Sequence, residues 1–466
     1  MADLKGTSWQ QQYSATEIYT LKCRMLDKPT TFARVSAAIG QAGAHLHQTI
    51  SSGVEGEYVI RDITVYVAAK SQLDEALKLI GQIDGAEVTG VRNDVLETHR
   101  LGSINVVSRA PLRSLTDLRM VYTPGVAQAC QEIEKDADKA WELTGLCNRV
   151  AVVTNGTAVL GLGDIGVVPS LPVMEGKASI FAEFVGISAF PILVDTKDVD
   201  EFVEAVARIA PSFGAIQMED VAAPACFEIE EKLRARLNIP VVHDDQHGTA
   251  TILLAAIINA LKQTGKEAKK CSVIILGAGA AGMAISKMLL GFGLGDIVVY
   301  DSYGAIYRGR TEKMNPYKMQ LAEVTNKKNQ KGTLAECFKG KDIFIGVARP
   351  NMVTKDMVAS MAKDPIAFPL SNPVGEITVE EALEAGAAIA ADGRGINNAL
   401  AYPALFRGAL DVKATEINLQ MQLAASRKIA ELAPEGVLLP DILDRSVHAV
   451  IAEAVAEEWL RQKRGS

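Results

Sequence analysis

Residues 271–290, CSVIILGAGAAGMAISKMLL, form an apolar run, a glycine-rich turn and a second apolar segment. The glycines have the spacing G-x-G-x-x-G between a predicted strand and a predicted helix. They permit a tight turn and let a pyrophosphate approach the amino end of the helix. The next run, DIVVYD (296–301), ends in an acid about 20 residues further on, where a carboxylate binds the ribose hydroxyls of an adenosine. The stretch predicts a Rossmann-type dinucleotide site that includes Gly277, Gly279, Ala280, Ala281, Gly282 and Asp301.

The charge of Asp301 bears on the choice of cofactor. A carboxylate at this position repels the 2′-phosphate of NADP, so the sequence favours NAD over NADP. Arg308 and Arg310 follow in YGAIYRGR (303–310) and could reach back to a phosphate, but solvated surface arginines are the commoner case. We therefore expect NAD.

Short apolar runs that end in glycine or aspartate recur beyond residue 100, and helical segments lie between most of them. Besides the two runs above they are LGLGDIG (160–166), FVGISAFPILVDT (184–196), IPVVHDD (239–245), KDIFIGVA (341–348) and AIAADG (388–393). This alternation predicts an α/β fold with parallel sheets covered by helices, in which ligands bind at the carboxyl ends of the strands.

Length and composition limit the possible classes of protein. A chain of 466 residues has room for about three domains. A net charge of -8 argues against a nucleic-acid partner, because phosphates would not be neutralised. The apolar stretch TILLAAIINALK (251–262) is shorter than the ~18 residues of a membrane span, and no signal peptide is evident. The six cysteines have no close spacing that would indicate zinc or a disulfide framework. We expect a soluble cytoplasmic protein.

Residues 15–97 have a different pattern. Alternating apolar residues (19–25) precede the turn DKPTTF (27–32), a helix that ends at Gly43, two strands, a second helix and a short strand. The order β-α-β-β-α-β is that of a ferredoxin-like unit. It resembles an ACT domain, a ligand-sensing module that usually pairs with another copy, although Thr30 stands where that family has glycine. The resemblance implies regulation by a small effector; a domain that serves dimerisation alone is the alternative.

Two acidic pairs stand at predicted strand ends. Glu219 and Asp220 end the run GAIQMED (214–220), and Asp244 and Asp245 end IPVVHDD. Three carboxylates from two strand ends suit a hard divalent cation, because Mg²⁺ and Mn²⁺ prefer oxygen ligands. Alternatively, such pairs can act as general acids and bases or cap helices.

Residues 105–466 resemble a malic enzyme. The motifs that carry the resemblance occur in the family's order: VYTPGVA (121–127), LGLGDIG (160–166), EGKASIF (175–181), MEDVAAP (218–224), HDDQHGTA (243–250), GAGAAG (277–282), LSNP (370–373) and NNALAYPALFRGALDV (397–412). With the N-terminal module, the whole chain resembles the NAD-dependent malic enzymes that carry an ACT domain. This implies an ACT-like regulatory domain (15–97), a malic-enzyme N-terminal α/β catalytic domain (105–240) and a Rossmann-type NAD-binding domain with C-terminal helices (241–466).

The resemblance also implies roles for individual residues. The family's metal ligands, which hold Mg²⁺ or Mn²⁺, correspond to Glu219, Asp220 and Asp245. Its general base corresponds to Lys177, the acid beside that lysine to Asp244, and its general acid to Tyr122. Positions that hold substrate carboxylate and nicotinamide correspond to Asn372 and Asn397.

Three expectations concern the surroundings of these residues. His243 should hydrogen-bond within the site rather than bind metal, because oxygen donors dominate there. Gly248 and Thr249 should start the next helix, with Thr249 able to cap it or to touch cofactor phosphate. Ala158 stands where many members of the family have a substrate-binding arginine, so another group must hold the distal carboxylate of the substrate.

The reaction that the resemblance implies is the oxidative decarboxylation of L-malate to pyruvate and CO₂ with reduction of NAD. Lys177, with a pKa lowered by the neighbouring cation, would take the hydroxyl proton as hydride leaves C2, and Tyr122 would protonate C3 after loss of CO₂. A malolactic reaction that releases lactate is one alternative. A catalytically silent sensor of NAD and metabolites is another. We expect a homodimer or a higher homo-oligomer.

Overall fold

The computed structural model describes residues 17–159, 161–372 and 374–465, and the chain forms two compact units that meet between Asn105 and Val106. Each unit is considered by itself. Positions 15 and 16 of the predicted N-terminal domain lie outside the described residues. Within the described ranges, no helix has the combination of length and apolar character that crossing a membrane requires.

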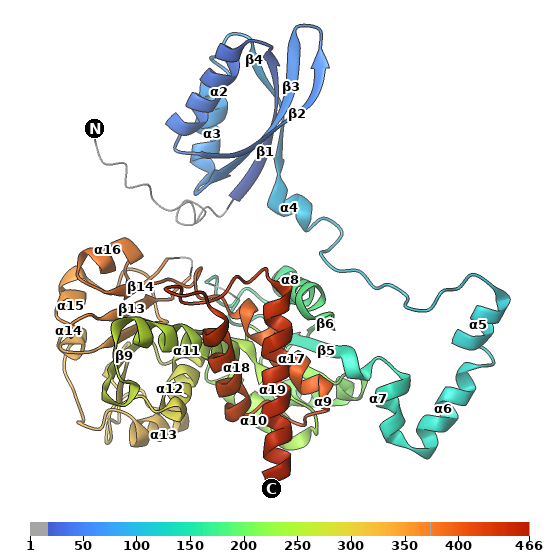
Figure 1. Ribbon diagram of the computed structural model, residues 1–466, viewed down its shortest axis with the longest axis vertical. Coiled ribbons are helices and arrows are strands. Elements are labelled where there is room, and N and C mark those ends of the chain that lie inside the picture. Colours follow the sequence, from blue (N-terminus) through green and yellow to red (C-terminus); the bar gives the residue numbers. More distant parts are fainter. Residues whose placement is uncertain (1–16, 160, 373, 466) are drawn as a thin grey trace. The chain divides into compact units, whose positions relative to one another are not determined.

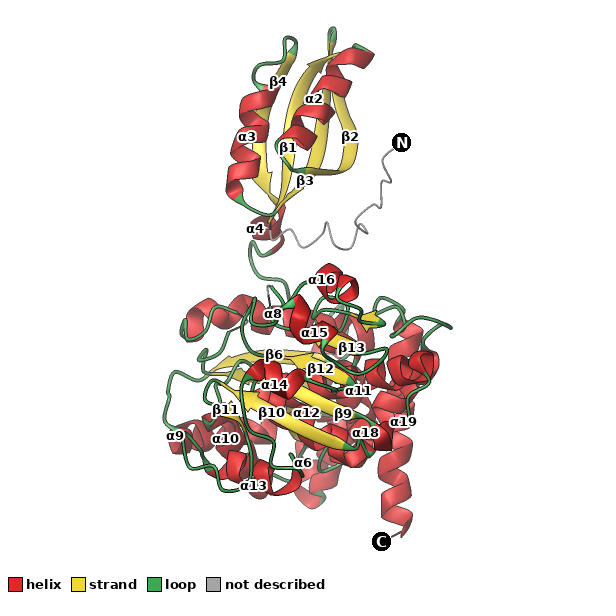
Figure 2. Cartoon of the chain, turned by 90° about the vertical axis from the view of Figure 1, so that its left-hand side faces the viewer, coloured by secondary structure: helices red, strands yellow, loops and turns green. Residues whose placement is uncertain are grey.

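The first unit has the predicted β-α-β-β-α-β order. Its elements are β1 (Glu17–Leu26), α2 (Pro29–Gln41), β2 (His45–Glu55), β3 (Tyr58–Val67), α3 (Lys70–Ile80) and β4 (Ala86–Asn93), followed by α4 (Asp94–Thr98). The antiparallel sheet has the order β2-β3-β1-β4, and α2 and α3 cover one of its faces (Figure 2). Alternate residues of β1, Leu21 and Cys23 among them, pack with Ile63 and Val65 of β3 beneath the helices. The predicted ferredoxin-like arrangement is confirmed.

The second unit contains two sheets. The four-stranded sheet has the order β6-β5-β7-β8, and all its strands are parallel. Its strands are β5 (Arg149–Thr154), β6 (Ser188–Leu193), β7 (Ala215–Met218) and β8 (Val241–His243), and the helices between them are α8 (Val167–Val185), α9 (Val199–Ile209) and α10 (Ala225–Arg236). The run LGLGDIG was predicted as a strand and this is wrong: its described residues form a loop, tied by a single bridge between Val159 and Gly163.

The six-stranded sheet has the order β11-β10-β9-β12-β13-β14, in which only β11 is antiparallel to its neighbour. Its strands are β9 (Ser272–Leu276), β10 (Asp296–Asp301), β11 (Gly304–Ala305), β12 (Ile343–Gly346), β13 (Ile366–Pro369) and β14 (Ile389–Ala390). Helices lie on both sides of it (Figure 2): α12 (Ala280–Phe292), α13 (Pro316–Val324), α14 (Leu334–Phe338), α15 (Lys355–Ala359) and α16 (Val379–Glu384). The predicted parallel α/β fold is therefore present.

Helix α11 (Asp244–Thr264) joins the two sheets and is buried along most of its length. It packs against α12, α18 (Leu419–Leu432), the 3-10 helix η5 (Asn398–Leu400) and α17 (Tyr402–Asp411), and α19 (Arg445–Gly465) packs against α17 and α18. Because α11 starts directly at the end of β8, its first residues face the crevice at the carboxyl ends of the four-stranded sheet.

The segment before β5 forms an arm rather than part of the core. It comprises α5 (Leu115–Val121), α6 (Val126–Lys135), η1 (Ala137–Lys139), α7 (Ala140–Leu143) and η2 (Leu146–Asn148). In Figure 1, α5 and α6 extend away from the two sheets of this unit. None of the residues of α5, α6 and α7, all of which the structure describes, is buried.

Candidate active site

The two acidic pairs predicted at strand ends lie beside each other. Met218 of β7 and His243 of β8 are paired neighbours in the parallel register. Glu219 and Asp220 follow Met218, while Asp244 and Asp245 form the first turn of α11. Carboxylates are favoured at that position because the amino end of a helix carries partial positive charge.

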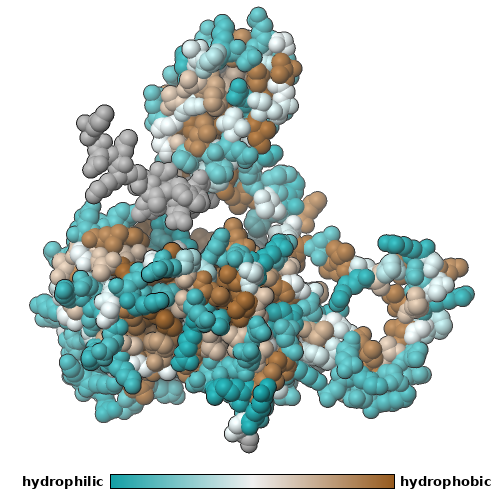
Figure 3. Space-filling view, viewed as in Figure 1, coloured by the Kyte–Doolittle hydropathy of each residue, from teal (hydrophilic) through white to brown (hydrophobic). Residues whose placement is uncertain are grey.

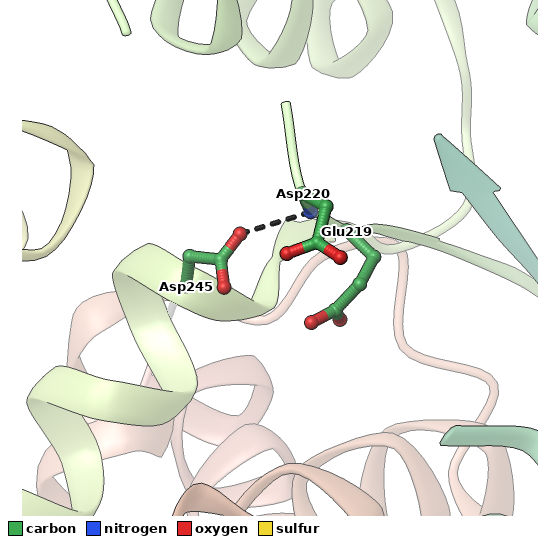
Figure 4. Close-up of side chains that lie close together, drawn as sticks. All are labelled: Glu219, Asp220 and Asp245. Atoms are coloured by element: carbon green, nitrogen blue, oxygen red, sulfur yellow. Dashed lines mark hydrogen bonds between the residues drawn. The ribbon is translucent and has the colours of Figure 1, made fainter. Parts of the chain in front are cut away.

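Glu219, Asp220 and Asp245 form a compact cluster of carboxylates (Figure 4). Each offers an oxygen, and these oxygens lie within 4.8 Å of one another. The backbone N–H of Asp220 donates to Oδ2 of Asp245 at 3.0 Å. Asp220 has a φ of 54°, a left-handed conformation that aspartate tolerates better than most residues and that is often found at functional sites.

The donor set of this cluster fits a hard divalent cation. The three side chains offer only oxygens, and those of Glu219 and Asp220 are almost completely buried. Bringing three carboxylates together in a buried place is electrostatically unfavourable unless positive charge compensates them. The cluster therefore has the chemistry that Mg²⁺ or Mn²⁺ requires, whereas an arbitrary group of exposed acids does not.

Lys177 reaches this cluster from α8. Its Nζ lies 2.5 Å from Oδ2 of Asp244 and 3.1 Å from Oε1 of Glu219, and Asp244 is completely buried. The amide of Asn398 donates to the same Oδ2 of Asp244 at 2.8 Å. The ring of Tyr402 lies 4.6 Å from Nζ, a cation–π contact that also excludes water. Lys177 is thus held in one position by Glu219, Asp244 and Tyr402, and Asn398 holds Asp244.

Burial and neighbouring charges shift the pKa values of the charged groups of the site in different directions. Burial lowers the pKa of Lys177, but Asp244 and Glu219 raise it more, so its pKa lies well above the usual value. Burial raises the pKa of Glu219 well above its usual value, despite the opposing effect of Lys177. Burial also raises the pKa of Asp245, but His243 lowers it more, so the net shift is downward. The lowered pKa predicted for Lys177 presupposes a bound cation; in the protein without one, the carboxylates of Asp244, Glu219 and Asp245 raise that pKa.

The two histidines of HDDQHGTA pair with acids. Nδ1 of His243 hydrogen-bonds to Nε2 of Gln246 at 3.1 Å, in line with the predicted hydrogen bond, and its Nε2 lies 3.2 Å from Oδ2 of Asp245. Nε2 of His247 lies 2.8 Å from Oε1 of the buried Glu230. Gly248 and Thr249 do not start the helix, because α11 already begins at Asp244. A Cβ at Gly248 would lie 1.8 Å from Oδ1 of Asp244, so this glycine makes room for that carboxylate.

The glycine-rich turn has the predicted geometry. Strand β9 ends at Leu276, and α12 begins at Ala280 directly after Gly279. Gly277 has a φ of +119°, and a Cβ at Gly282 would lie 2.0 Å from the carbonyl oxygen of Gly277. A Cβ at Gly279 would meet nothing within 4 Å. The first and third glycines thus serve the turn and the packing, and the second leaves open space at the amino end of α12.

Asp301 ends β10 as predicted, but its charge is already paired. Nη2 of Arg310 lies 2.8 Å from Oδ1 of Asp301, and Nζ of Lys318 lies 2.6 Å from Oδ2. Asp301 and Arg310 are both buried. The positive charges of Arg310 and Lys318 therefore weaken the repulsion by which Asp301 was expected to exclude a 2′-phosphate.

The remaining predicted residues lie apart from these contacts or at their margin. Asn372 is exposed after β13, and Thr249 is partly buried within α11. The side chain of Asn397 accepts from the N–H of Ala399 at 2.9 Å and so caps η5. Tyr122 ends α5 in the arm and is 68% exposed.

Three further residues of the region were not predicted from the sequence. Asn398 and Tyr402 belong to the quoted motif NNALAYPALF, but their contacts with Asp244 and Lys177 depend on the fold of distant segments. Glu376 is completely buried; its carboxylate accepts from the N–H of Ala348 at 2.7 Å and from the hydroxyl of Ser371 at 2.6 Å. It ties the loop after β12 to the loop that contains Asn372, and a lone glutamate gives no sequence pattern that would predict this.

Comparisons with known proteins agree with this geometry. Residues 102–234 match the family model "Malic enzyme, N-terminal domain", and residues 246–460 match "Malic enzyme, NAD binding domain". The chain is 43% identical to an NAD-dependent malic enzyme of Geobacillus stearothermophilus over 452 residues, which covers 95% of this chain and 94% of the relative. It is 48% identical to a bifunctional malic/malolactic enzyme of Bacillus subtilis over 379 residues, covering 79% and 92%.

A solved structure gives the same result for the fold. The crystal structure of an NAD-dependent malic enzyme from Thermotoga maritima superposes with a TM-score of 0.75 at 40% identity, covering 78% of this chain and 99% of that one. The carboxylate cluster, the buried lysine and the glycine-rich turn therefore occur in a chain that belongs to the malic enzyme family.

Proposed function

We propose that the protein catalyses the oxidative decarboxylation of L-malate to pyruvate and CO₂ with reduction of NAD, and that the reaction depends on Mg²⁺ or Mn²⁺. Membership of the malic enzyme family makes the chain an oxidoreductase, and relatives over nearly its full length are named for NAD. The observation that carries the proposal is the buried pair of Lys177 and Asp244 beside the cluster of Glu219, Asp220 and Asp245.

In this proposal the divalent cation supplies positive charge to the substrate and NAD supplies the hydride acceptor, while side chains of the protein do the rest. Glu219, Asp220 and Asp245 would hold the divalent cation. The open space at Gly279 supports a pyrophosphate at the amino end of α12.

Lys177 is the proposed general base. Its Nζ takes the proton of the C2 hydroxyl while the hydride leaves C2, and Asp244 and Asn398 hold the lysine and its partner carboxylate in position. With the protein alone, the pKa of Lys177 is too high for this task, so the base requires the carboxylates around it to be compensated. Breaking the C3–C4 bond then releases CO₂ and leaves the enol of pyruvate.

Tyr122 is the proposed general acid that protonates C3 of this enol. Tyr402 is the other tyrosine to consider, since its ring contacts Lys177. Its hydroxyl, however, donates to the backbone carbonyl oxygen of Lys177 at 3.3 Å, and its side chain is completely buried. Tyr402 therefore suits a positioning role better than proton transfer to substrate.

Asn372, Asn397 and Thr249 complete the proposed set of groups around the cofactor. Asp301 supports binding of the adenosine ribose, but its pairing with Arg310 and Lys318 means that the preference for NAD over NADP is a matter of degree.

The N-terminal unit is proposed to be an ACT-like regulatory domain. Its β-α-β-β-α-β order and its sheet order support this assignment. Regulation requires that an effector bind two states of the enzyme with different affinity. Titration of amino acids and dicarboxylates against activity and melting temperature tests it; if no compound changes either quantity, the unit has only a structural role.

The central experiment measures NADH and CO₂ released from L-malate with NAD, with Mn²⁺ and with a chelator. Equal amounts of NADH and CO₂ that disappear with the chelator support the proposal. One relative is named a bifunctional malic/malolactic enzyme, so lactate must be measured too. Lactate and CO₂ without NADH identify the malolactic reaction instead. No turnover under any condition favours the alternative of a catalytically silent sensor.

A further inference from the structure

Three residues around the start of α11 contact one buried carboxylate on α10. Nε2 of Gln246 donates to Oε2 of Glu230 at 3.1 Å, and the backbone N–H of His243 donates to Oε1 at 3.3 Å. Nε2 of His247 lies 2.8 Å from the same Oε1. Hydrophilic side chains cover much of the surface shown in Figure 3, which is the usual place of a glutamate, but Glu230 is only 6% exposed. Burying a carboxylate is unfavourable unless such contacts compensate it, so these groups form one coupled network.

Glu230 acts as an acceptor at both of its oxygens. Burial raises the pKa of Glu230, but its contacts with His247 lower it more, so the pKa lies below the usual value for glutamate. The side chain is therefore ionised, and an ionised carboxylate accepts hydrogen bonds without donating any. Every group that faces Oε1 or Oε2 in this network must bring a hydrogen to it.

The amide of Gln246 bridges Glu230 and His243. Its Nε2 carries two hydrogens and lies 3.1 Å from Oε2 of Glu230 and 3.1 Å from Nδ1 of His243. The carboxylate selects this end of the amide, because the amide oxygen in the same place would face Oε2 without a hydrogen between them. An amide nitrogen only donates, so Nδ1 of His243 accepts and the hydrogen of the neutral imidazole is on Nε2. Glu230 thus determines the tautomer of His243 through Gln246.

The other ring nitrogen of His243 lies against the carboxylate cluster. Its Nε2 is 3.2 Å from Oδ2 of Asp245, and the ring is completely buried. The same Oδ2 accepts from the backbone N–H of Asp220 at 3.0 Å (Figure 4). The side chain of Asp245 is 35% exposed, whereas those of Glu219 and Asp220 are almost completely buried. Asp245 is therefore the member of the cluster with room to turn towards solvent, and contacts at Oδ2 hold its direction.

We propose that Glu230 is a positioning residue for the divalent cation: through Gln246 and His243 it fixes the direction in which Asp245 presents its carboxylate. The proposal rests on the metal dependence of the proposed function and adds a residue that lies outside the cluster. Removal of such an outer contact typically lowers metal affinity or activity by about 10- to 100-fold. If Glu230 only joins α10 to α11, its removal lowers stability and leaves metal affinity unchanged.

Glu230→Gln tests the proposal, because it keeps the size of the side chain and removes the charge that selects the amide nitrogen of Gln246. We expect the affinity for Mn²⁺, measured by calorimetry, to fall about tenfold. The kcat for malate at saturating Mn²⁺ should return close to the wild-type value, since Lys177 and its partners are unchanged. A lower melting temperature with wild-type affinity for Mn²⁺ overturns the proposal.

The matched control is the next residue of the chain. Glu231 is exposed, and its carboxylate accepts from the hydroxyl of Tyr317 at 3.1 Å. Glu231→Gln removes the same charge one position away and should leave the affinity for Mn²⁺ unchanged. An equal loss of affinity in both variants would mean that net charge alone is responsible, and it overturns the proposal. A wild-type protein that binds no Mn²⁺ contradicts the metal dependence of the proposed function itself, which keeps the two failures distinct.

A double-variant cycle tests whether Glu230 acts through Gln246. Gln246→Leu removes the amide bridge and should lower the affinity for Mn²⁺ about as much as Glu230→Gln does. The variant with both changes should lose no more than either single variant, because two changes along one chain of contacts are not additive. Losses that add would show that the two residues act separately, which contradicts the proposed chain of contacts.

A spectroscopic measurement on the wild-type protein is independent of how the variants fold. The chain has six histidines, so the ring nitrogens of ¹⁵N-histidine-labelled protein saturated with Mg²⁺ can be resolved by NMR. The signal that disappears in His243→Asn identifies His243. We expect its hydrogen on Nε2 and none on Nδ1. A hydrogen on Nδ1 is incompatible with the donor at Gln246 and overturns the proposal.

Discussion

Nζ of Lys177 and Oδ2 of the completely buried Asp244 lie 2.5 Å apart, and Asp244 is not part of the carboxylate cluster to which its neighbour Asp245 belongs. The two adjacent aspartates therefore have separable tasks. Asp244→Asn should lower kcat by about 10²–10⁴, because it removes the carboxylate charge that holds the lysine in position. The affinity for Mn²⁺ should change little.

Asp245→Asn is the matched comparison. It removes one carboxylate of the cluster, so Mn²⁺ should bind more weakly, and saturating Mn²⁺ should restore part of the activity. Titration of Mn²⁺ by calorimetry, beside kcat at saturating metal, measures both effects. A loss of Mn²⁺ affinity in Asp244→Asn as large as that in Asp245→Asn contradicts the division of tasks.

Metal binding should depend on pH through Glu219. Its pKa is raised well above the usual value by burial and by the neighbouring acids, which favours the protonated carboxyl in the protein without metal. A raised carboxyl pKa stabilises the fold below the unfolded pKa, and this contribution is lost as pH rises through the folded pKa. A cation must displace that proton, so its affinity rises with pH by up to about tenfold for each pH unit, which is ~1.4 kcal/mol.

The measurement is the increase in melting temperature that Mn²⁺ causes, taken between about pH 6 and about pH 8. The increase should grow with pH in the wild-type protein and become independent of pH in Glu219→Gln. An equal increase at both pH values in the wild-type protein would show that no proton leaves when the metal binds.

The parts of the fold that follow from local patterns could be predicted from the sequence. The strand before Gly277, the helix after Gly279 and the end of β10 at Asp301 depend on apolar runs and glycines that lie close together in the chain. The position of Glu219 beside Asp244 could also be predicted, because parallel strands place their carboxyl ends at one edge.

Contacts made by distant segments could not be predicted in this way. Asn398 rather than Asn397 reaches Asp244, and nothing in the dipeptide distinguishes the two side chains. Lys318 pairs with Asp301 only because α13 packs beside β10. The loop LGLGDIG has the apolar residues of a strand, but its glycines leave it without a neighbour in the sheet.

Gly279 and Gly282 of the cofactor turn should respond differently to alanine. Gly282→Ala places a Cβ 2.0 Å from the carbonyl oxygen of Gly277, so the melting temperature should fall. Gly279→Ala meets no atom within 4 Å and should leave the melting temperature nearly unchanged, while the KM for NAD rises because the space for the pyrophosphate is filled. Thermal unfolding and NAD titration of both variants separate the effects. An unchanged KM in Gly279→Ala would contradict the proposed position of the pyrophosphate.

The pairing of Asp301 with Lys318 makes a prediction about cofactor choice. Lys318 is partly exposed and lies 2.6 Å from Oδ2 of Asp301, so it offsets the charge that a 2′-phosphate would meet. Lys318→Ala should lower kcat/KM for NADP about tenfold more than for NAD, the effect of losing one hydrogen bond to a charged group. Lys313→Ala changes a nearby lysine whose Nζ faces the ring of Tyr303 and serves as the control. Equal losses with both cofactors would mean that Lys318 acts only on the fold.

The paired asparagines offer the most direct comparison of neighbouring residues. Asn398 donates to Oδ2 of Asp244 at 2.8 Å, and Asn397 accepts from the N–H of Ala399 to cap η5. Asn398→Ala should lower kcat by about 10- to 100-fold, since it removes a hydrogen bond worth about 1.5–3 kcal/mol to a charged group.

Asn397→Ala removes a cap and should lower the free energy of unfolding by about 1 kcal/mol. If Asn397 also holds the nicotinamide, as proposed, its substitution raises the KM for NAD, whereas Asn398→Ala leaves that KM unchanged and acts on kcat. Steady-state kinetics and thermal unfolding of both variants are the measurements. A fall in kcat from Asn397→Ala with none from Asn398→Ala would contradict the role of the Asp244 contact, because the two residues are adjacent and only one of them makes it.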